Sequence, residues 1–136
     1  MAKIESKKSE AHAPAQKVYE FLLDMNNIEK LLPKAKYSDW KSDGNSCSFK
    51  VQSAYYIGLK MLSSDAYSNV KYESTQGTPF PFTLDVTLSE ANGVTVAQLL
   101  CDANINPFLE MLVKGPLKNL FDYMADKLSS EFSVPV

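Results

Sequence analysis

The apolar residues repeat with a period of two through the middle of the chain. In residues 82–89, Phe, Leu, Val and Leu are interleaved with Thr, Asp, Thr and Ser. Alternation of this kind is typical of strands that bury one face. We expect six such strands, in segments 36–42, 46–52, 55–64, 69–76, 82–90 and 94–105. The hairpin-type turns Asp43-Gly44-Asn45 and Ala91-Asn92-Gly93 indicate that the sheet is antiparallel.

The residues before this region predict one strand and two short helices. Residues 2–12 are extended in character but polar, which is typical of an edge strand. Pro14 then opens a helix, because the missing N–H of proline costs nothing in a first turn. Three apolar residues at helical spacing give this helix a buried face: Val18, Phe21 and Leu22. Asn26 or Asn27 can cap a second short helix, which Pro33 ends.

A long helix is predicted at the end of the chain. Asn106 is a good cap and Pro107 a good first residue for it. Gly115-Pro116 should break or kink the helix, because Pro116 removes a hydrogen bond to the preceding turn. After this step the apolar residues lie within a stripe of about 100°, as expected for a helix laid on a sheet: Leu117, Leu120, Phe121, Met124 and Leu128.

Before the Gly-Pro step, the apolar residues of segment 107–113 point in nearly every direction: Phe108, Leu109, Met111, Leu112 and Val113. Three interpretations fit this pattern. The segment is buried on both sides, between the sheet and an overlying loop. Alternatively, part of its surface faces a cavity or the mouth of one, where a hydrophobic ligand replaces core atoms. The third interpretation is a contact between two copies of the chain, since exposed apolar patches usually mark interfaces.

Strand alternation also separates inward from outward side chains. Asp85 and Asp102 fall on the outward parity and are expected to be solvated. One of Tyr55 and Tyr56 should face inward, although the pattern does not decide which. The inward set contains a few polar residues, namely Tyr72, Ser74 and Ser63. A buried tyrosine hydroxyl must find a partner, either a ligand oxygen or a group at the sheet rim.

Composition and charge narrow the class of protein. A chain of 136 residues with 45% hydrophobic content can build a real core, and we expect one domain spanning 1–136. The net charge is −2 and the chain contains no arginine, which argues against nucleic acid as a partner. The segment MAKIESKKSE has no apolar run after its lysines, unlike a signal peptide, and no stretch predicts a membrane span. Cytoplasmic localisation is therefore expected.

Few residues point to catalysis, cofactors or metals. The single histidine, His12, lies at the end of the first predicted strand, where surface positions are usual. Cys47 and Cys101 lie in alternating apolar runs without metal-ligand spacing, so we expect buried small hydrophobes. The sequence contains no Gly-rich phosphate loop, HExxH helix or CxxC pair. No catalytic residue, metal or cofactor is predicted.

The order of the predicted elements resembles the START-like, Bet v 1-like superfamily, which includes polyketide cyclase and coenzyme Q-binding families. The segment KKSEAHAPAQKVYEFLLDMNNIEKLLP carries the resemblance most clearly, and Lys7 and Lys8 in it replace residues that are more apolar in typical members. The resemblance implies an α+β helix-grip fold, with a seven-stranded curved antiparallel sheet wrapped around the long C-terminal helix. It also implies a cavity between the concave sheet, this helix and the two short helices.

This resemblance implies binding or transport of a hydrophobic small molecule, such as a lipid, quinone or polyketide. An enzyme of the polyketide cyclase or hydratase type is an alternative that requires Tyr72, His12 or an inward carboxylate to meet in the cavity. A homodimeric interaction module that uses segment 107–113 is another. The residues expected to line the cavity are Phe49, Val51, Ile57, Leu59, Met61, Tyr72, Phe82, Leu84, Val86, Leu99, Cys101, Ala103, Leu117, Leu120, Phe121 and Met124.

Overall fold

The computed structural model describes residues 2–33, 37–51 and 55–132. The elements follow in the order β1 (Ala2–Glu5), β2 (Ser9–Ala11), α1 (Ala15–Leu23), η1 (Met25–Leu31), β3 (Tyr37–Ser42), β4 (Ser46–Val51), β5 (Tyr55–Asp65), β6 (Asn69–Ser74), β7 (Phe82–Ala91), β8 (Val94–Ala103) and α2 (Pro107–Glu131). The predicted ends at Lys36 and Gln52 lie outside the described residues.

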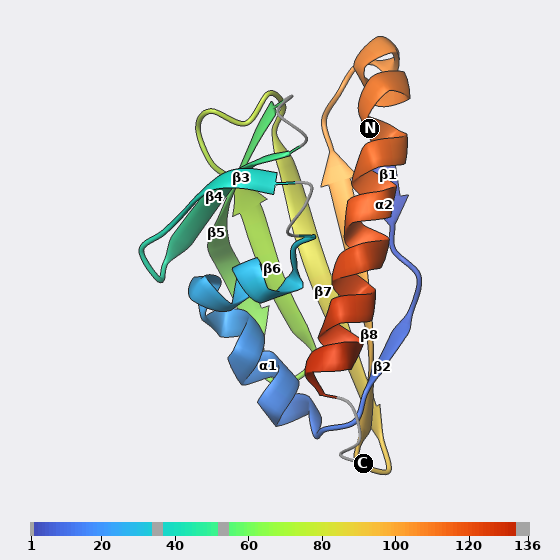
Figure 1. Ribbon diagram of the computed structural model, residues 1–136. Coiled ribbons are helices and arrows are strands. Elements are labelled where there is room, and N and C mark those ends of the chain that lie inside the picture. Colours follow the sequence, from blue (N-terminus) through green and yellow to red (C-terminus); the bar gives the residue numbers. More distant parts are fainter. Residues whose placement is uncertain (1, 34–36, 52–54, 133–136) are drawn as a thin grey trace.

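The strands form one curved antiparallel sheet in the order β1-β8-β7-β6-β5-β4-β3, and β2 also pairs with β8. The first strand thus pairs with the last, and consecutive hairpins supply the rest. Figure 1 shows α2 running along the sheet near β8 and β1, with α1 and η1 beside it over the neighbouring strands, so all three helices cover the same face of the sheet. The predicted α+β helix-grip arrangement is confirmed, and each of the six predicted middle strands is present.

The first strand differs from the prediction because it is broken into β1 and β2. The buried Ser6 lies at the break, where its hydroxyl accepts a hydrogen bond from the backbone N–H of Leu99 at 2.9 Å. Lys7 and Lys8 are therefore exposed, and the Lys7 Nζ lies 2.7 Å from an Asp126 carboxylate oxygen. The break explains how two lysines fit into a strand that packs beside the core, and it raises the strand number from seven to eight.

The starts of the two short helices differ from the prediction, which placed Pro14 in the first turn of one and Asn26 or Asn27 as the cap of the other. Pro14 is the residue before α1 rather than its first residue, and a Glu90 carboxylate oxygen accepts from the Ala15 N–H at 2.7 Å. A carboxylate favours this end of a helix, where backbone N–H groups lack partners. Asp24 caps η1 by accepting from the Asn26 N–H at 2.9 Å. Pro33 lies beyond the end of η1, as predicted.

The long helix α2 begins as predicted, with the Asn106 side chain accepting from the Leu109 N–H at 2.8 Å. The predicted break at Gly115-Pro116 is wrong, because α2 continues through it. A proline inside a helix costs about 3 kcal/mol, and large apolar side chains contribute about 1.5–3 kcal/mol each when buried. Packing therefore offsets this cost through the buried residues on both sides of Pro116: Val113, Leu117, Leu120, Phe121, Met124, Ala125 and Leu128.

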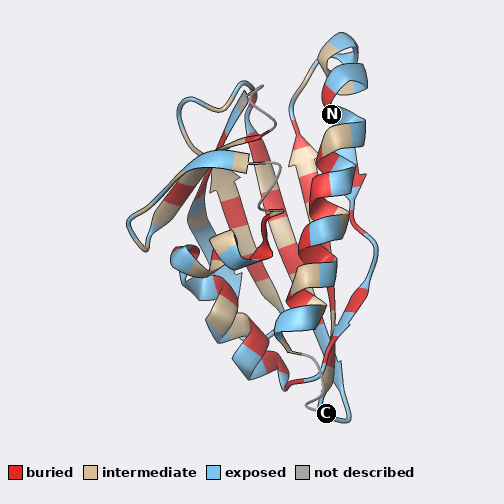
Figure 2. Ribbon diagram, viewed as in Figure 1, coloured by how far each residue is buried: buried red, intermediate tan, exposed pale blue. Residues whose placement is uncertain are grey.

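The core lies on the concave face of the sheet, and the predicted inward residues of β4, β7 and β8 are buried. Figure 2 shows buried and half-buried positions alternating along these strands. The prediction for Ser63 is wrong: it is exposed. The pairing of β5 with β6 shifts between Met61 and Ser63, which leaves Leu62 as an extra residue in a bulge. A bulge reverses the parity of the residues beyond it.

Two glycines provide a matched test of this packing. A Cβ at the buried Gly58 would collide with the side chain of Thr75, whereas a Cβ at the exposed Gly115 would meet nothing within 4 Å beyond the neighbouring residues of its own helix. Gly58→Ala should lower the free energy of unfolding by about 1–3 kcal/mol. Gly115→Ala should change it by less than about 0.5 kcal/mol, because the higher helix propensity of alanine is opposed by the contact of its Cβ with the ring of Pro116. Urea unfolding checks both, and a loss at Gly115→Ala as large as the loss at Gly58→Ala would contradict the packing described.

Candidate functional site

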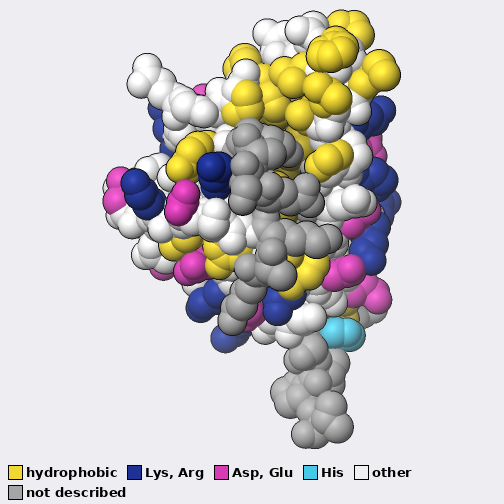
Figure 3. Space-filling model, turned by 45° about the horizontal axis from the view of Figure 1, so that its top comes forward, with side chains coloured by type: hydrophobic (Ala, Val, Ile, Leu, Met, Phe, Trp, Pro, Cys, Tyr) yellow, Lys and Arg dark blue, Asp and Glu magenta, His cyan; other side chains and the backbone are white. Residues whose placement is uncertain are grey.

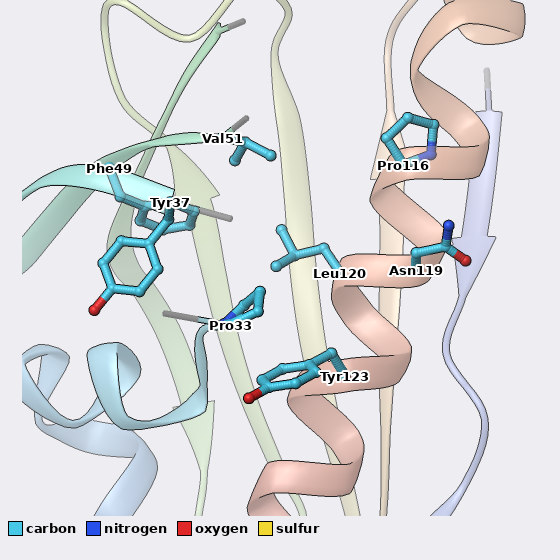
Figure 4. A pocket seen from close by; sticks show the side chains of 8 residues that line it. All are labelled: Pro33, Tyr37, Phe49, Val51, Pro116, Asn119, Leu120 and Tyr123. Atoms are coloured by element: carbon cyan, nitrogen blue, oxygen red, sulfur yellow. The ribbon is translucent and has the colours of Figure 1, made fainter. Parts of the chain in front are cut away.

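An open pocket lies between α2 and the β3–β4 hairpin, next to Pro33, which follows the Leu32 cap of η1. We call it the outer pocket, and its volume is about 170 Å³. Figure 4 shows Leu120 reaching from α2 into the space, with Phe49 and Val51 across from it and Tyr123 extending toward Pro33. The described residues that line the outer pocket are Pro33, Tyr37, Phe49, Val51, Pro116, Asn119, Leu120 and Tyr123.

The interior between the sheet and α2 is almost completely filled. A void of about 10 Å³ remains there, and the side chains around it are all apolar. A buried water needs about 10–15 Å³ and two to four polar partners, so this inner void has no room for a ligand. Phe49 and Leu120 border both spaces and separate the inner void from the outer pocket. The open space therefore lies at one end of the helix-grip fold and not along its whole interior.

The residues predicted to line a cavity fall into three groups. Phe49, Val51 and Leu120 line the outer pocket. A second group borders only the inner void: Ile57, Leu59, Phe82, Leu84, Phe121 and Met124. The third group packs in the core or at its margin and borders neither space: Met61, Tyr72, Val86, Leu99, Cys101, Ala103 and Leu117.

Sequence reasoning missed five residues of the outer pocket, namely Pro33, Tyr37, Pro116, Asn119 and Tyr123. All five are exposed or half-buried, so a search for inward apolar residues passes over them. On α2, however, Pro116, Asn119 and Tyr123 recur at helical spacing beside the buried stripe. That spacing places the three residues along one side of the helix, next to its buried stripe, and it is the signal in the sequence from which this wall of the outer pocket could have been found.

The tyrosine hydroxyls near the interior are already hydrogen-bonded within the protein. The Tyr72 hydroxyl is buried and donates to the Leu22 carbonyl at the end of α1, at 2.6 Å. Burial raises the pKa of Tyr72 well above its usual value, so the hydroxyl stays protonated. The Tyr37 hydroxyl donates to a Glu29 carboxylate at 3.0 Å, and partial burial followed by this bond raises the pKa of Tyr37.

The remaining candidate residues do not converge on the outer pocket. His12 is exposed beyond the end of β2, and Tyr56 is exposed with its hydroxyl 3.1 Å from Asp39. The side chain of Tyr55 lies outside what the structure describes. Asp85 and Asp102 lie on the outward parity of β7 and β8, as predicted, but the prediction that they are solvated is wrong because both are half-buried. One carboxylate oxygen of Asp102 is buried and has no hydrogen-bond partner among the described residues. Within residues 2–33, 37–51 and 55–132, no cluster of three or more His, Cys, Asp or Glu side chains could hold a metal ion.

The apolar segment before Gly115 is largely exposed, so the interpretation that it is buried on both sides is wrong. Phe108 is 72% exposed, Met111 82% and Leu112 58%, whereas Val113 turns inward and is buried. We call Phe108, Met111 and Leu112 the apolar cap. Figure 3 shows hydrophobic side chains gathered at this end of the molecule, with charged side chains along its flanks. No helix in the described parts of the chain combines the length and apolar character that crossing a bilayer requires.

Solved structures share this fold at low sequence identity. XoxI from Bacillus cereus is similar over 97% of this chain and 96% of its own, with a TM-score of 0.74 and 13% identity. A Chromobacterium violaceum protein gives a TM-score of 0.66 and 16% identity over 98% of both chains. TTHA0849 from Thermus thermophilus gives 0.67 and 12% identity, over 96% of this chain and 97% of its own. No protein-family model and no curated protein match the sequence. These likenesses show the fold alone.

Burial of the two thiols predicts that the free energy of unfolding depends on pH. Burial raises the pKa of Cys47 and of Cys101 from 9.0 to about 12, with smaller effects of Asp43 and Asp102. The pKa of each thiol is higher in the folded protein than in the unfolded chain. The stability that comes from burying the neutral thiols is therefore complete below pH 9 and is lost as the pH rises toward 12. The free energy of unfolding should fall by about 1.4 kcal/mol per pH unit per thiol in that window.

Urea unfolding of wild type and of a Cys47→Ala, Cys101→Ala variant between pH 8 and pH 11 measures this slope. The wild type should show the steeper decline, and its thiols should react with a chromogenic disulfide only after unfolding. Equal slopes in the two proteins, or rapid reaction of the native thiols at pH 8, would contradict their burial.

Proposed function

We propose that this protein is a member of the START-like, Bet v 1-like superfamily that binds a hydrophobic small molecule in the outer pocket. The outer pocket itself is the observation that carries the proposal. It combines about 170 Å³ of open volume with walls that include the apolar side chains of Phe49, Val51 and Leu120. Ligand sites of proteins are concave and mostly apolar, with a few polar groups that fix orientation. The superfamily resemblance of the opening segment adds to this proposal.

The volume limits the size of the bound group. An apolar cavity of about 150 Å³ accepts a benzene molecule, whereas pockets that enclose drug-sized ligands measure about 300–1,000 Å³. At about 170 Å³, the outer pocket matches a single ring or a short branched chain. A larger ligand would therefore place one such group inside and leave the rest outside, along the surface of α2.

The lining determines the chemistry of the ligand. The described lining residues carry no charged side chain, and three of them are aromatic: Tyr37, Phe49 and Tyr123. The Tyr37 hydroxyl is occupied by Glu29, so Asn119 and Tyr123 at the exposed rim are left to receive a polar atom of the ligand. This arrangement favours a neutral, flat group with its hydrogen-bonding atom near the mouth of the pocket.

The contacts favour binding over the cyclase or hydratase alternative. That alternative requires a titratable group in the pocket, and the Tyr72 hydroxyl is held by Leu22 while His12 is exposed on another part of the molecule. Neither residue lines the outer pocket. A thiol nucleophile is also disfavoured, because burial keeps Cys47 and Cys101 protonated near neutral pH.

Pocket-filling variants test the proposal, with phenol as a neutral single-ring probe. Val51→Phe adds a ring to the wall of the outer pocket, and Asn119→Trp narrows its mouth from an exposed position that should not disturb folding. Each should weaken phenol binding by at least about tenfold, measured by NMR chemical-shift titration. Val96→Phe is the matched control, because Val96 is half-buried on β8 but does not line the outer pocket.

Each variant must show a cooperative unfolding transition for its titration to be interpreted. Binding that survives both pocket variants would contradict the proposed site. Failure of the wild type to bind any neutral aromatic probe would contradict the proposed function.

A further inference from the structure

The end of the molecule that carries the apolar cap has unusually few charges. Charged residues form 22% of the chain, yet segments 74–84 and 103–109 contain no Asp, Glu, Lys, Arg or His. The first includes the β6–β7 loop and the second joins β8 to α2, and both lie at the upper end in Figure 1. The Asn104 N–H donates to the Pro81 carbonyl at 2.9 Å, so the two segments are in direct contact.

Two charged residues of α2 lie beside the apolar cap, and the Lys114 Nζ and a Glu110 carboxylate oxygen are 3.9 Å apart, so they offset each other. The opposite end of the sheet differs, because the turns there begin at Asp43 and Asp65. The molecule is therefore polarised, with one end that is apolar or uncharged and another that carries acidic side chains. Segments without charges can enter a region of low dielectric constant without the desolvation cost of an ion.

The apolar cap is continuous with the outer pocket. Phe108, Leu112, Pro116 and Leu120 follow one another at intervals of four residues and so lie along one face of α2. Pro116 and Leu120 line the outer pocket, while Phe108 and Leu112 are exposed. A single apolar face thus leads from the tip of the helix to the pocket, and whatever covers the tip lies next to the pocket mouth.

The size of the apolar cap argues against a second copy of the chain as its partner. A stable interface between proteins takes about 20–30 residues from each side, and the cap offers three large, strongly exposed apolar side chains. Insertion of a few apolar side chains is instead how a peripheral protein contacts a bilayer, since the acyl region takes up side chains one at a time and needs no complementary shape.

We propose that the apolar cap docks on the surface of a lipid bilayer, with Phe108, Met111 and Leu112 inserted at the boundary between headgroups and acyl chains. The contact is reversible, because one small hydrophobic anchor gives only marginal membrane binding. It depends little on anionic lipid, because the inserted end carries no net charge. This docking goes beyond ligand binding and does not require the outer pocket to be occupied.

Flotation with large unilamellar vesicles tests the proposal. Wild type should float partially with phosphatidylcholine vesicles, and adding phosphatidylglycerol or raising the salt concentration should change the bound fraction little. Met111→Ser and Leu112→Ser should each weaken the partition by about tenfold. Both residues are exposed, so the fold is retained, and Leu62→Ser is the matched control because Leu62 is 47% exposed on β5, away from the apolar cap. Val51→Phe should float like wild type, which separates this proposal from the proposed function.

Three outcomes would overturn the proposal. The first is a wild type that does not float, or that floats equally well after substitution of the apolar cap. The second is flotation that requires phosphatidylglycerol and disappears at high salt, since this would assign the contact to lysines. The third is a dimer in light scattering that Met111→Ser dissociates, because the apolar cap would then serve a second copy of the chain.

Discussion

The packing of α2 against the curved sheet is the constraint on which the rest of the structure depends. A sheet with one apolar face must cover that face with another layer, and here α2 supplies that cover together with α1 and η1. Leu120, Phe121 and Met124 reach across to side chains of β4, β5 and β7 and leave only about 10 Å³ between them. The outer pocket remains open on the flank between α2 and the β3–β4 hairpin.

The same arrangement explains why the hydroxyl groups next to the interior are not available to a ligand. Hydroxyl groups that could reach the interior are bonded inside the protein, Tyr72 to the Leu22 carbonyl and Tyr37 to Glu29. These bonds connect β6 to α1 and β3 to η1, so they hold the short helices beside the sheet. The same two hydrogen bonds thus hold the short helices in place and occupy the two hydroxyl groups.

Much of the fold could be predicted because it follows from local pattern. Alternation located the strands, and helical spacing identified the buried residues of α2 from Leu117 to Leu128. The break at Ser6 and the bulge at Leu62 could not be predicted, since each depends on how two strands pair. The outer pocket was only partly predictable for a similar reason. Tyr37 and Tyr123 belong to it because β3 and α2 lie apart, and no pattern within either segment encodes that separation.

Diffraction from a xenon-pressurised crystal shows where the open space lies, because xenon enters apolar cavities of this size without requiring a specific ligand. We expect one xenon site in the outer pocket, between Leu120 of α2 and Val51 of β4, and none in the inner void behind Leu120. Xenon in the space between Phe121, Leu84 and Leu59 would contradict this expectation, because the interior would then be the real cavity. An outer pocket that contains no xenon would contradict it equally.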